Sequence, residues 1–153
     1  YIMKNDNPSI PQHVTINELR NINVNHNELF YLLQQLTSAP VLDKQAYLEV
    51  IHNLSQNQYI FVMSNNDKPI GMISLIIEQK LIHSGAKVAH IEDLIVDKAH
   101  QHKGYATKLI QHVIALAKLH QCYKCILNCT DEVKPLYDKN GFTKKTNGMS
   151  IYF

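Results

Sequence analysis

One segment near the middle of the chain constrains the fold more than any other. Residues 91–97 read Ile-Glu-Asp-Leu-Ile-Val-Asp, which predicts a buried strand, and a basic loop that contains Gly104 follows directly. From about Lys103 to His120, apolar residues recur at helical spacing. The unpaired N–H groups of this helix start would then lie beside the end of the strand. Because the helix dipole also favours negative charge there, the segment predicts a site for an anionic group such as a phosphate.

The glycine spacing distinguishes this segment from the common phosphate loops. A P-loop needs G-x-x-x-x-G-K-[ST] and a dinucleotide fold needs three spaced glycines, and neither pattern is present. His102, Lys103 and Lys108 add positive charge around Gly104. A single glycine is weak support, so an ordinary strand–loop–helix turn with a solvated basic face stays an alternative.

The remaining pattern predicts one mixed α+β domain. The 153 residues suit a single domain, and 45% hydrophobic with 18% charged residues is ordinary globular composition. Residues 1–12 are expected to form a flexible leader before a domain at 13–153. Antiparallel hairpins around one βαβ crossover predict a mixed, mostly antiparallel sheet flanked by helices. The expected strands are 14–19, 59–63, 69–78, 88–96, 124–129, 143–146 and 150–153, and the expected helices run from a cap at Asn27 to before Pro40, from Asp43, over about 103–120 and over 133–140.

Composition argues against several classes of partner. A net charge of +2 is too small to indicate a nucleic-acid partner. The longest mostly apolar window, Ile70–Ile77, is far shorter than the roughly 20 residues of a membrane-spanning helix. The first thirty residues lack the pattern of a secretory signal. We therefore expect a cytoplasmic protein with no nucleic-acid partner and no membrane insertion.

Three cysteines, Cys122, Cys125 and Cys129, lie close together after His120. An odd number of cysteines indicates a reducing compartment more than a disulfide scaffold. The spacing H-x-C-x-x-C-x-x-x-C could serve a zinc site. On a strand over 124–129, however, Cys125 and Cys129 would share one face, with Cys122 before it near the helix end. We interpret the three as small buried hydrophobic residues and expect no metal.

The loop after the central strand also carries a family motif. Gln101, Gly104 and Ala106 stand in the order Q-x-x-G-x-A, which resembles the acetyl-CoA pyrophosphate motif of the GNAT acetyltransferase superfamily. More specific segments make the chain from about Gln35 to Phe153 similar to the glucosamine 6-phosphate N-acetyltransferase family, above all I-E-x-K-x-I-H-S at 77–84 followed by E-D. The other matching segments are 86–87, 122–124 and 136–142. The resemblance implies the GNAT fold and transfer of an acetyl group from acetyl-CoA to glucosamine 6-phosphate, for the UDP-N-acetylglucosamine pathway.

The resemblance implies where acetyl-CoA would lie. Backbone groups of Leu94, Ile95 and Val96 are expected to meet the pantetheine arm. Tyr137 is expected to donate a proton to the departing thiolate, although packing under the sheet is the commoner role of a lone tyrosine. No Ser-His-Asp or Cys-His set is apparent, which favours direct attack in a ternary complex. The expected pyrophosphate-binding residues are His102, Lys103, Gly104, Tyr105, Ala106 and Thr107.

The resemblance also implies where the sugar phosphate would bind. Lys80 and His83 offer cationic donors for a phosphate, and Glu92 and Asp93 offer acceptors for hydroxyls or the amine. The amine's proton could pass to Glu92 or Asp93 through water, or to a backbone carbonyl. Because these two acids are adjacent in a predicted strand, we expect them on opposite faces, with at least one in apolar surroundings. The implied substrate residues are Thr37, Lys80, Leu81, Ile82, His83, Glu92, Asp93, Leu94 and Asn128.

Three positions depart from the family pattern. Asn128 stands where the family has a carboxylate, and Val133 stands where an asparagine reaches CoA. Tyr152 replaces a C-terminal arginine that contacts the phosphate from the partner subunit, so Lys80, His83 and Lys87 would carry more of that binding. The family is a homodimer with exchanged C-terminal strands. Residues 150–153 would leave an apolar edge exposed if unpaired, so we expect a dimer here too.

Two alternatives to this activity stay open. The chain could acetylate a different amine, such as a polyamine or a protein N-terminus, or could bind acetyl-CoA without catalysis. A polyamine pocket would need carboxylates in the Lys80–Lys87 loop, where the chain has a basic cluster.

Overall fold

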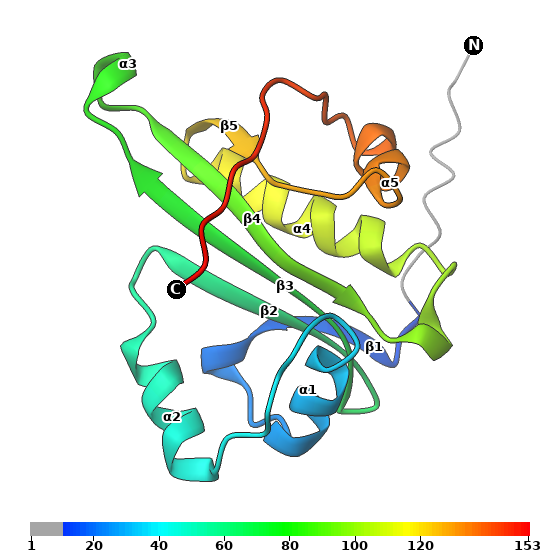
Figure 1. The fold of residues 1–153 in the computed structure, drawn as a ribbon. Coiled ribbons are helices and arrows are strands. Elements are labelled where there is room, and N and C mark those ends of the chain that lie inside the picture. Colours follow the sequence, from blue (N-terminus) through cyan, green and yellow to red (C-terminus); the bar gives the residue numbers. More distant parts are fainter. Residues whose placement is uncertain (1–10) are drawn as a thin grey trace.

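One five-stranded sheet forms the centre of the structure, a computed structural model that describes residues 11–153 (Figure 1). Three neighbouring pairs of strands are antiparallel and the pair β4–β5 is parallel, which confirms the predicted mixed, mostly antiparallel sheet. Residues 1–10 of the predicted leader lie outside the described range. The strands, in sheet order, are β1 (Val14–Glu18), β2 (Gln58–Asn65), β3 (Lys68–Gln79), β4 (Lys87–Val96) and β5 (Cys122–Ile126).

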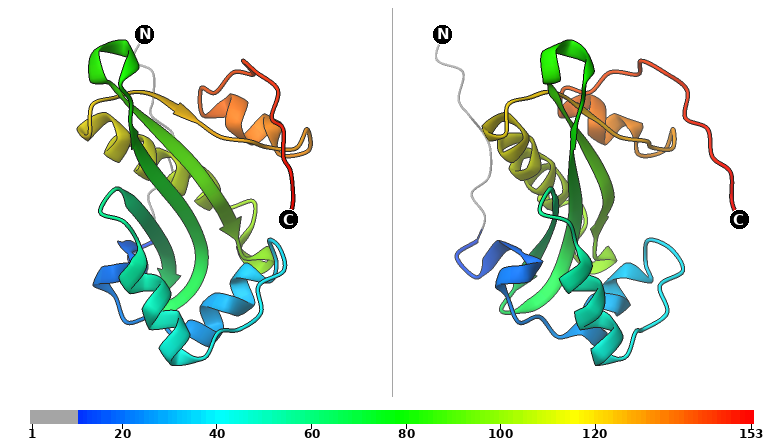
Figure 2. Two further views of the ribbon diagram at one scale, coloured as in Figure 1. Left: turned by 60° about the vertical axis from the view of Figure 1, so that its left-hand side comes forward. Right: turned by 90° about the vertical axis from the view of Figure 1, so that its left-hand side faces the viewer.

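Helices cover both faces of this sheet. In the right-hand view of Figure 2, α4 lies on one side of the sheet, while α1 and α2 lie on the other. The helix α5 follows β5, and the short α3 sits at the tip of the β3–β4 hairpin. The bounds are α1 (His26–Leu33), α2 (Lys44–Asn53), α3 (Ile82–Gly85), α4 (Tyr105–Leu119) and α5 (Lys134–Lys139), with 3-10 turns η1 (Leu19–Asn21) and η2 (Lys98–His100).

The two faces are packed to different degrees. On the α4 side, Leu109, Ile110 and Val113 are completely buried against β3 and its neighbours. On the other side, Leu29 and Leu32 of α1 pack on the sheet, but α2 has no buried residue. The second face is therefore covered incompletely, and the candidate site lies there.

Local signals placed most helix ends correctly, but both ends of α1 need correction, because this helix stops at Leu33 and not just before Pro40. Asp43 caps α2 as predicted, because its side chain accepts a hydrogen bond from the Ala46 N–H at 2.9 Å. Asn25, and not Asn27, caps α1, since its side chain accepts from the Glu28 N–H at 3.3 Å. Gly141 follows α5 at φ +87°, the left-handed conformation expected there.

The cysteine interpretation needs correction. Pairing of β5 with β4 extends only from Cys122 to Ile126, so Cys122 belongs to the strand and Cys129 lies outside it. Cys122 and Cys125 are half-buried and Cys129 is exposed, so the predicted burial of all three is wrong. The three thiols are free. Between residues 11 and 153, no group of three or more His, Cys, Asp or Glu side chains is arranged to hold a metal ion.

The predicted strands at 143–146 and 150–153 are not formed in this single chain. Residues 143–153 run as a tail that leaves the body of the protein in both views of Figure 2. Side chains near its end are almost fully exposed, with Tyr152 at 92%. A strand needs a partner edge, and the tail meets none among residues 11–153 of its own chain. Over residues 11–153, none of the helices combines the length and apolar character needed to cross a bilayer.

Candidate active site

A β-bulge in β4 defines the centre of the candidate site. Ser74 of β3 lies opposite Glu92, and Met72 lies opposite Ile95. Two residues of β4, Asp93 and Leu94, therefore lie opposite the single β3 residue between Met72 and Ser74. Asp93 adopts φ +52°, in the left-handed region. The bulge reverses the alternation of β4, because Ile91 before it and Val96 after it both pack on the α4 side.

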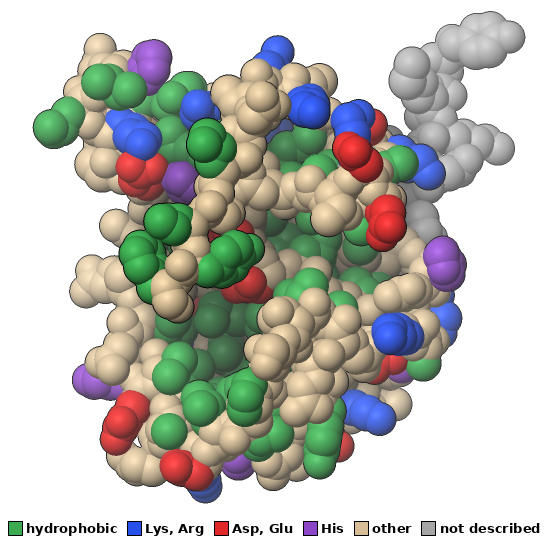
Figure 3. Space-filling model, viewed as in Figure 1, with side chains coloured by type: hydrophobic (Ala, Val, Ile, Leu, Met, Phe, Trp, Pro, Cys, Tyr) green, Lys and Arg blue, Asp and Glu red, His purple; other side chains and the backbone are tan. Residues whose placement is uncertain are grey.

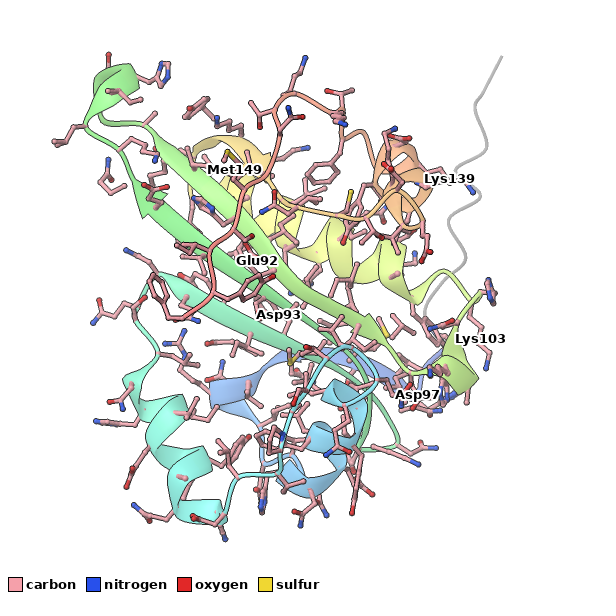
Figure 4. The ribbon with its side chains drawn as sticks, viewed as in Figure 1. Glu92, Asp93, Asp97, Lys103, Lys139 and Met149 are labelled. Carbon is pink, nitrogen blue, oxygen red and sulfur yellow. The ribbon has the colours of Figure 1, made fainter. Side chains whose placement is uncertain are left out.

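The bulge brings two carboxylates to the same face. Glu92 lies directly across from Ser74, and the Ser74 hydroxyl donates to Asp93 Oδ2 at 3.4 Å. Both acids are exposed on the face that α1 and α2 cover incompletely, where Figure 4 labels them side by side. The expectation of opposite faces is therefore wrong, because strict alternation fails at a bulge. The expected apolar surroundings hold for Asp93, which borders a largely apolar pocket.

Asp93 also borders a pocket of ≈ 270 Å³ between the sheet, α1 and α2. Thr37, predicted to bind substrate, lies in its wall beside mostly apolar side chains. Figure 3 shows a hollow on this face with a largely hydrophobic floor, and acidic side chains at the position where Figure 4 labels Glu92 and Asp93. The lining residues are Leu19, Leu29, Phe30, Leu33, Leu36, Thr37, Ala39, Leu42, Tyr47, Val50, Ile51, Ile60, Met72, Ser74 and Asp93.

A second cluster of polar side chains, Glu78, Lys80 and His90, lies along the same face toward the hairpin tip. Lys80 Nζ is 2.5 Å from Glu78 Oε1, and His90 Nε2 is 2.7 Å from Glu78 Oε2. Hydrogen bonds from Lys80, and then from His90, hold the pKa of Glu78 below its ordinary value. His90 precedes Glu92 by two strand residues, so their Cα atoms are roughly 7 Å apart on one face. Acids and bases therefore form a polar band along β3 and β4.

Of the other predicted substrate residues, Leu94 lies in the bulge next to Asp93, and the rest lie outside the pocket wall. Leu81, Ile82 and His83 are exposed at the hairpin tip, and the His83 ring is 4.9 Å from Tyr123 on β5. Asn128 lies beyond β5, where its Oδ1 is 2.9 Å from the position that a side-chain Cβ at Gly148 would take. The structure thus joins Thr37 with Asp93 at the pocket, and Lys80 with Glu78 and His90 in the polar band, whereas the hairpin tip and Asn128 do not line that pocket.

One edge of β4 is open beside the bulge. β5 pairs with β4 only over Lys87–His90, so residues 91–96 have no strand partner on that side. Beyond the opening, α5 carries Tyr137, which is buried, with its ring 5.9 Å from Phe142. Burial raises the pKa of Tyr137, with smaller electrostatic contributions from Cys129 and Glu92. The phenol is therefore protonated at neutral pH.

The start of α4 has the features of an anion site. Gly104 adopts φ +77° before the helix, and the first intrahelical bond runs from the Lys108 N–H to the Gly104 carbonyl at 3.1 Å. The N–H groups of 105–107 consequently have no acceptor within the helix. Apart from Gly104 and its two neighbours in the chain, no atom of the described residues lies within 4 Å of the position a Cβ on Gly104 would occupy, so a ligand could approach this backbone closely. Tyr105 is buried in the core and offers only its backbone. These donors suit a diphosphate.

Sequence reasoning missed several residues that shape the site. Ser74 and Glu78 share the face of Glu92, and alternation along β3 could have identified them. His90 could have been found by the same signal. No local signal points to Gln35, whose side chain hydrogen-bonds Asp97 at 3.0 Å across 62 residues of sequence.

Comparison with known proteins agrees with this geometry. The model of the Acetyltransferase (GNAT) family matches residues 26–142. A probable glucosamine 6-phosphate N-acetyltransferase 2 of Oryza sativa is 33% identical over 129 residues, which cover 80% of this chain and 78% of that protein. The Candida albicans glucosamine 6-phosphate N-acetyltransferase is 32% identical over 148 residues, 93% of this chain and 96% of that protein.

A solved structure shows the same fold. The crystal structure of glucosamine-6-phosphate N-acetyltransferase from Arabidopsis thaliana superposes with a TM-score of 0.79 and 30% identity, covering 92% of this chain and 98% of that one. The GNAT fold and the family resemblance predicted from the sequence are thereby confirmed.

The bulge predicts that valine lowers the free energy of unfolding at Asp93 but not at the adjacent Glu92. Asp93→Val should lower the free energy of unfolding by about 1–2 kcal/mol, because a β-branched side chain is strained in the left-handed region. Asp93→Asn should change it by less than about 0.5 kcal/mol, since asparagine tolerates that conformation. Glu92→Val is the matched control, because valine suits an exposed extended strand. Urea unfolding would measure all three, and equal losses for both valine variants would contradict a strained bulge.

Proposed function

The chain belongs to the acetyltransferase (GNAT) family, whose members use acetyl-CoA, and on that premise we propose that it acetylates the amine of glucosamine 6-phosphate. The products would be N-acetylglucosamine 6-phosphate, for the UDP-N-acetylglucosamine pathway, and CoA. The main observation in support is the bulge, which puts two carboxylates on an open face beside the free edge of β4. The names of relatives that match most of the chain support the same acceptor.

The proposed acetyl-CoA site follows β4 into α4. The pyrophosphate would accept hydrogen bonds from the N–H groups of residues 102–107, where Gly104 leaves space for its approach. The pantetheine amides would pair with the unpartnered edge of Leu94–Val96, as an added strand does. In Figure 4, Asp97 and Lys103 mark the phosphate end of this path, and Glu92 and Asp93 lie further back along β4.

The proposed acceptor site is the polar band. The amine would lie at Glu92 and Asp93, which can accept its hydrogen bonds, and the phosphate would lie toward Lys80 and His90. Glucosamine 6-phosphate carries its amine on C2 and its phosphate on C6, on opposite sides of the ring, so the separation of acids and bases along β4 suits it. Thr37 would contact the sugar from the pocket wall.

The proposed reaction is direct attack in a ternary complex. Acetyl-CoA supplies the acetyl group as a thioester. Glu92 or Asp93, through water, or a backbone carbonyl would take the proton that the amine must lose. The N–H of Leu94 would donate to the carbonyl oxygen as negative charge develops there. Tyr137, protonated because of its raised pKa, would donate to the departing sulfur, so one proton passes overall from the amine to the thiol.

A second candidate is an amine with an apolar portion. The largely apolar lining of the pocket beside Asp93 favours such an acceptor, for example the methylene chain of a polyamine. The acids of the band would bind a second amino group. Direct comparison of acceptors separates the two functions.

We also propose a homodimer in which the C-terminal tails cross between subunits. Met149, Ile151, Tyr152 and Phe153 are exposed by at least 78%, an apolar segment that a partner surface would cover. A partner tail could cross the polar face of the other subunit and contribute to the phosphate site. The three free cysteines suit a reducing, cytoplasmic location.

The acceptor proposal predicts a preference for the phosphorylated sugar. With thiol release from acetyl-CoA as the assay, kcat/KM should be at least about tenfold higher for glucosamine 6-phosphate than for glucosamine, because charge-assisted hydrogen bonds hold the phosphate. Lys80→Ala should reduce that preference. Lys44→Ala, at an exposed lysine of α2, is the control and should leave the preference unchanged. Comparable rates with glucosamine, or higher rates with spermidine, would contradict the proposed acceptor.

Tyr137→Phe should reduce kcat by about 100-fold and leave the KM for both substrates nearly unchanged, because only the hydroxyl is removed. Tyr31→Phe, at an exposed tyrosine of α1, is the control for the substitution itself. Steady-state kinetics of thiol release would measure both. An unchanged kcat in Tyr137→Phe would assign sulfur protonation to water or to another group.

The dimer proposal predicts twice the monomer mass in solution. Light scattering at micromolar concentration should give about twice 17.6 kDa, and a variant that ends at Phe142 should give the monomer mass and lose activity. A monomeric full-length chain would contradict the exchange of tails. A truncated chain that stays dimeric would locate the interface elsewhere.

A further inference from the structure

The side chain of Gln35 bridges two segments that belong to different halves of the site. It lies in the loop after α1, and its amide Nε2 donates to Asp97 Oδ2 at 3.0 Å. Its Oε1 accepts from the backbone N–H of Lys98 at 2.9 Å. Both ends of one amide are thus used on the segment that follows β4, and Gln35 itself is half-buried. Such two-point contact fixes orientation as well as distance.

On one side, Gln35 directly precedes two residues of the pocket wall. The next residues, Leu36 and Thr37, line the pocket together with Ala39 and Leu42. Backbone bonds from the Leu36 and Thr37 N–H groups to the Leu33 carbonyl tie this loop to the end of α1. A ligand in the pocket would therefore contact the segment that carries Gln35.

On the other side, Asp97 organises the start of the anion loop. Its Oδ1 accepts from the Ala99 N–H at 2.8 Å, and its own N–H donates to the Ile70 carbonyl at 2.8 Å. His100 Nδ1 lies 3.4 Å from the same Oδ1. The Gln35 hydrogen bond is the largest cause of a lowered pKa at Asp97, so this carboxylate is ionised at neutral pH. Figure 4 shows Asp97 and Lys103 together at this end of the site.

We propose that Gln35 is a positioning residue that couples acceptor binding to acetyl-CoA binding. The inference rests on the proposed function, because it takes an acceptor in the polar band to contact Thr37 of the pocket wall, and takes the α4 loop as the diphosphate site. An acceptor that orders the loop at Leu36 and Thr37 holds Gln35 in place, and Gln35 then holds residues 97–98 at the entrance to the anion loop. By linkage, acetyl-CoA favours acceptor binding by the same factor.

The test measures CoA affinity by calorimetry with and without glucosamine 6-phosphate. CoA is the probe because it carries no acetyl group, so the ternary complex cannot react. In the unmodified protein we expect glucosamine 6-phosphate to tighten CoA binding about fivefold or more. In Gln35→Ala the factor should fall to about one. Gln35→Glu keeps the length and the acceptor but replaces the donor with a charge facing Asp97, and should lose the coupling too.

Gln34→Ala is the matched control. The Gln34 side chain donates to the Ala39 carbonyl at 3.1 Å, so it shapes the same loop without reaching the segment after β4. It should keep the coupling seen in the unmodified protein. Equal loss of coupling in Gln34→Ala and Gln35→Ala would mean that loop order alone matters, and would overturn the inference.

The outcomes separate this inference from the proposed function. If the unmodified protein binds CoA but no glucosamine 6-phosphate, the proposed function fails and the coupling with it. If both ligands bind and their affinities are independent, or if Gln35→Ala or Gln35→Glu keeps the full coupling, only the role of Gln35 fails. Thermal unfolding of each variant would verify that it is folded during the measurement.

Discussion

The extra residue in β4 is the constraint on which the site depends. With unbroken alternation, one of the two adjacent acids would point into the α4 core, where an unpaired carboxylate is costly. The bulge keeps Ile91 and Val96 in that core and turns both Glu92 and Asp93 toward the open face. Asp93 adopts a left-handed conformation to make this possible, which is the kind of local strain that a well-packed sheet can hold. Packing of the core thus determines the arrangement of the acids.

The same strand also separates the two proposed binding regions. Its first four residues pair with β5, and its remaining residues lose that neighbour as β5 turns toward α5. The open edge so created leads from the acids to the unpaired N–H groups at Gly104. A thioester held along this edge would present its reactive end to the acids and its diphosphate to the helix start. The helix α5, which contains Tyr137, lies across the opening from β4.

Features set by local chemistry were predictable from the sequence, and features set by distant contacts were not. The strand–loop–helix around Gly104, the cap at Asp43 and the left-handed Gly141 follow from patterns a few residues long. The faces of Glu92 and Asp93 were predicted wrongly because a bulge depends on how β4 meets β3. The prediction of strands at the C-terminus was wrong for the single chain, because β-favouring residues form a strand only beside a partner edge. The Gln35–Asp97 pair spans 62 residues and leaves no local signature.

Charge balance connects the acceptor proposal with the dimer proposal. Along the polar face, Glu78, Glu92 and Asp93 carry three negative charges, and Lys80 is the one permanent cation among the residues placed in that band. Because Glu78 already pairs with Lys80 and His90, a phosphate there would compete with a carboxylate for the same donors. Binding a dianion then requires cations from outside the band. The tail, which includes Lys144 and Lys145, has no strand partner in its own chain, and a second subunit could supply it to this face.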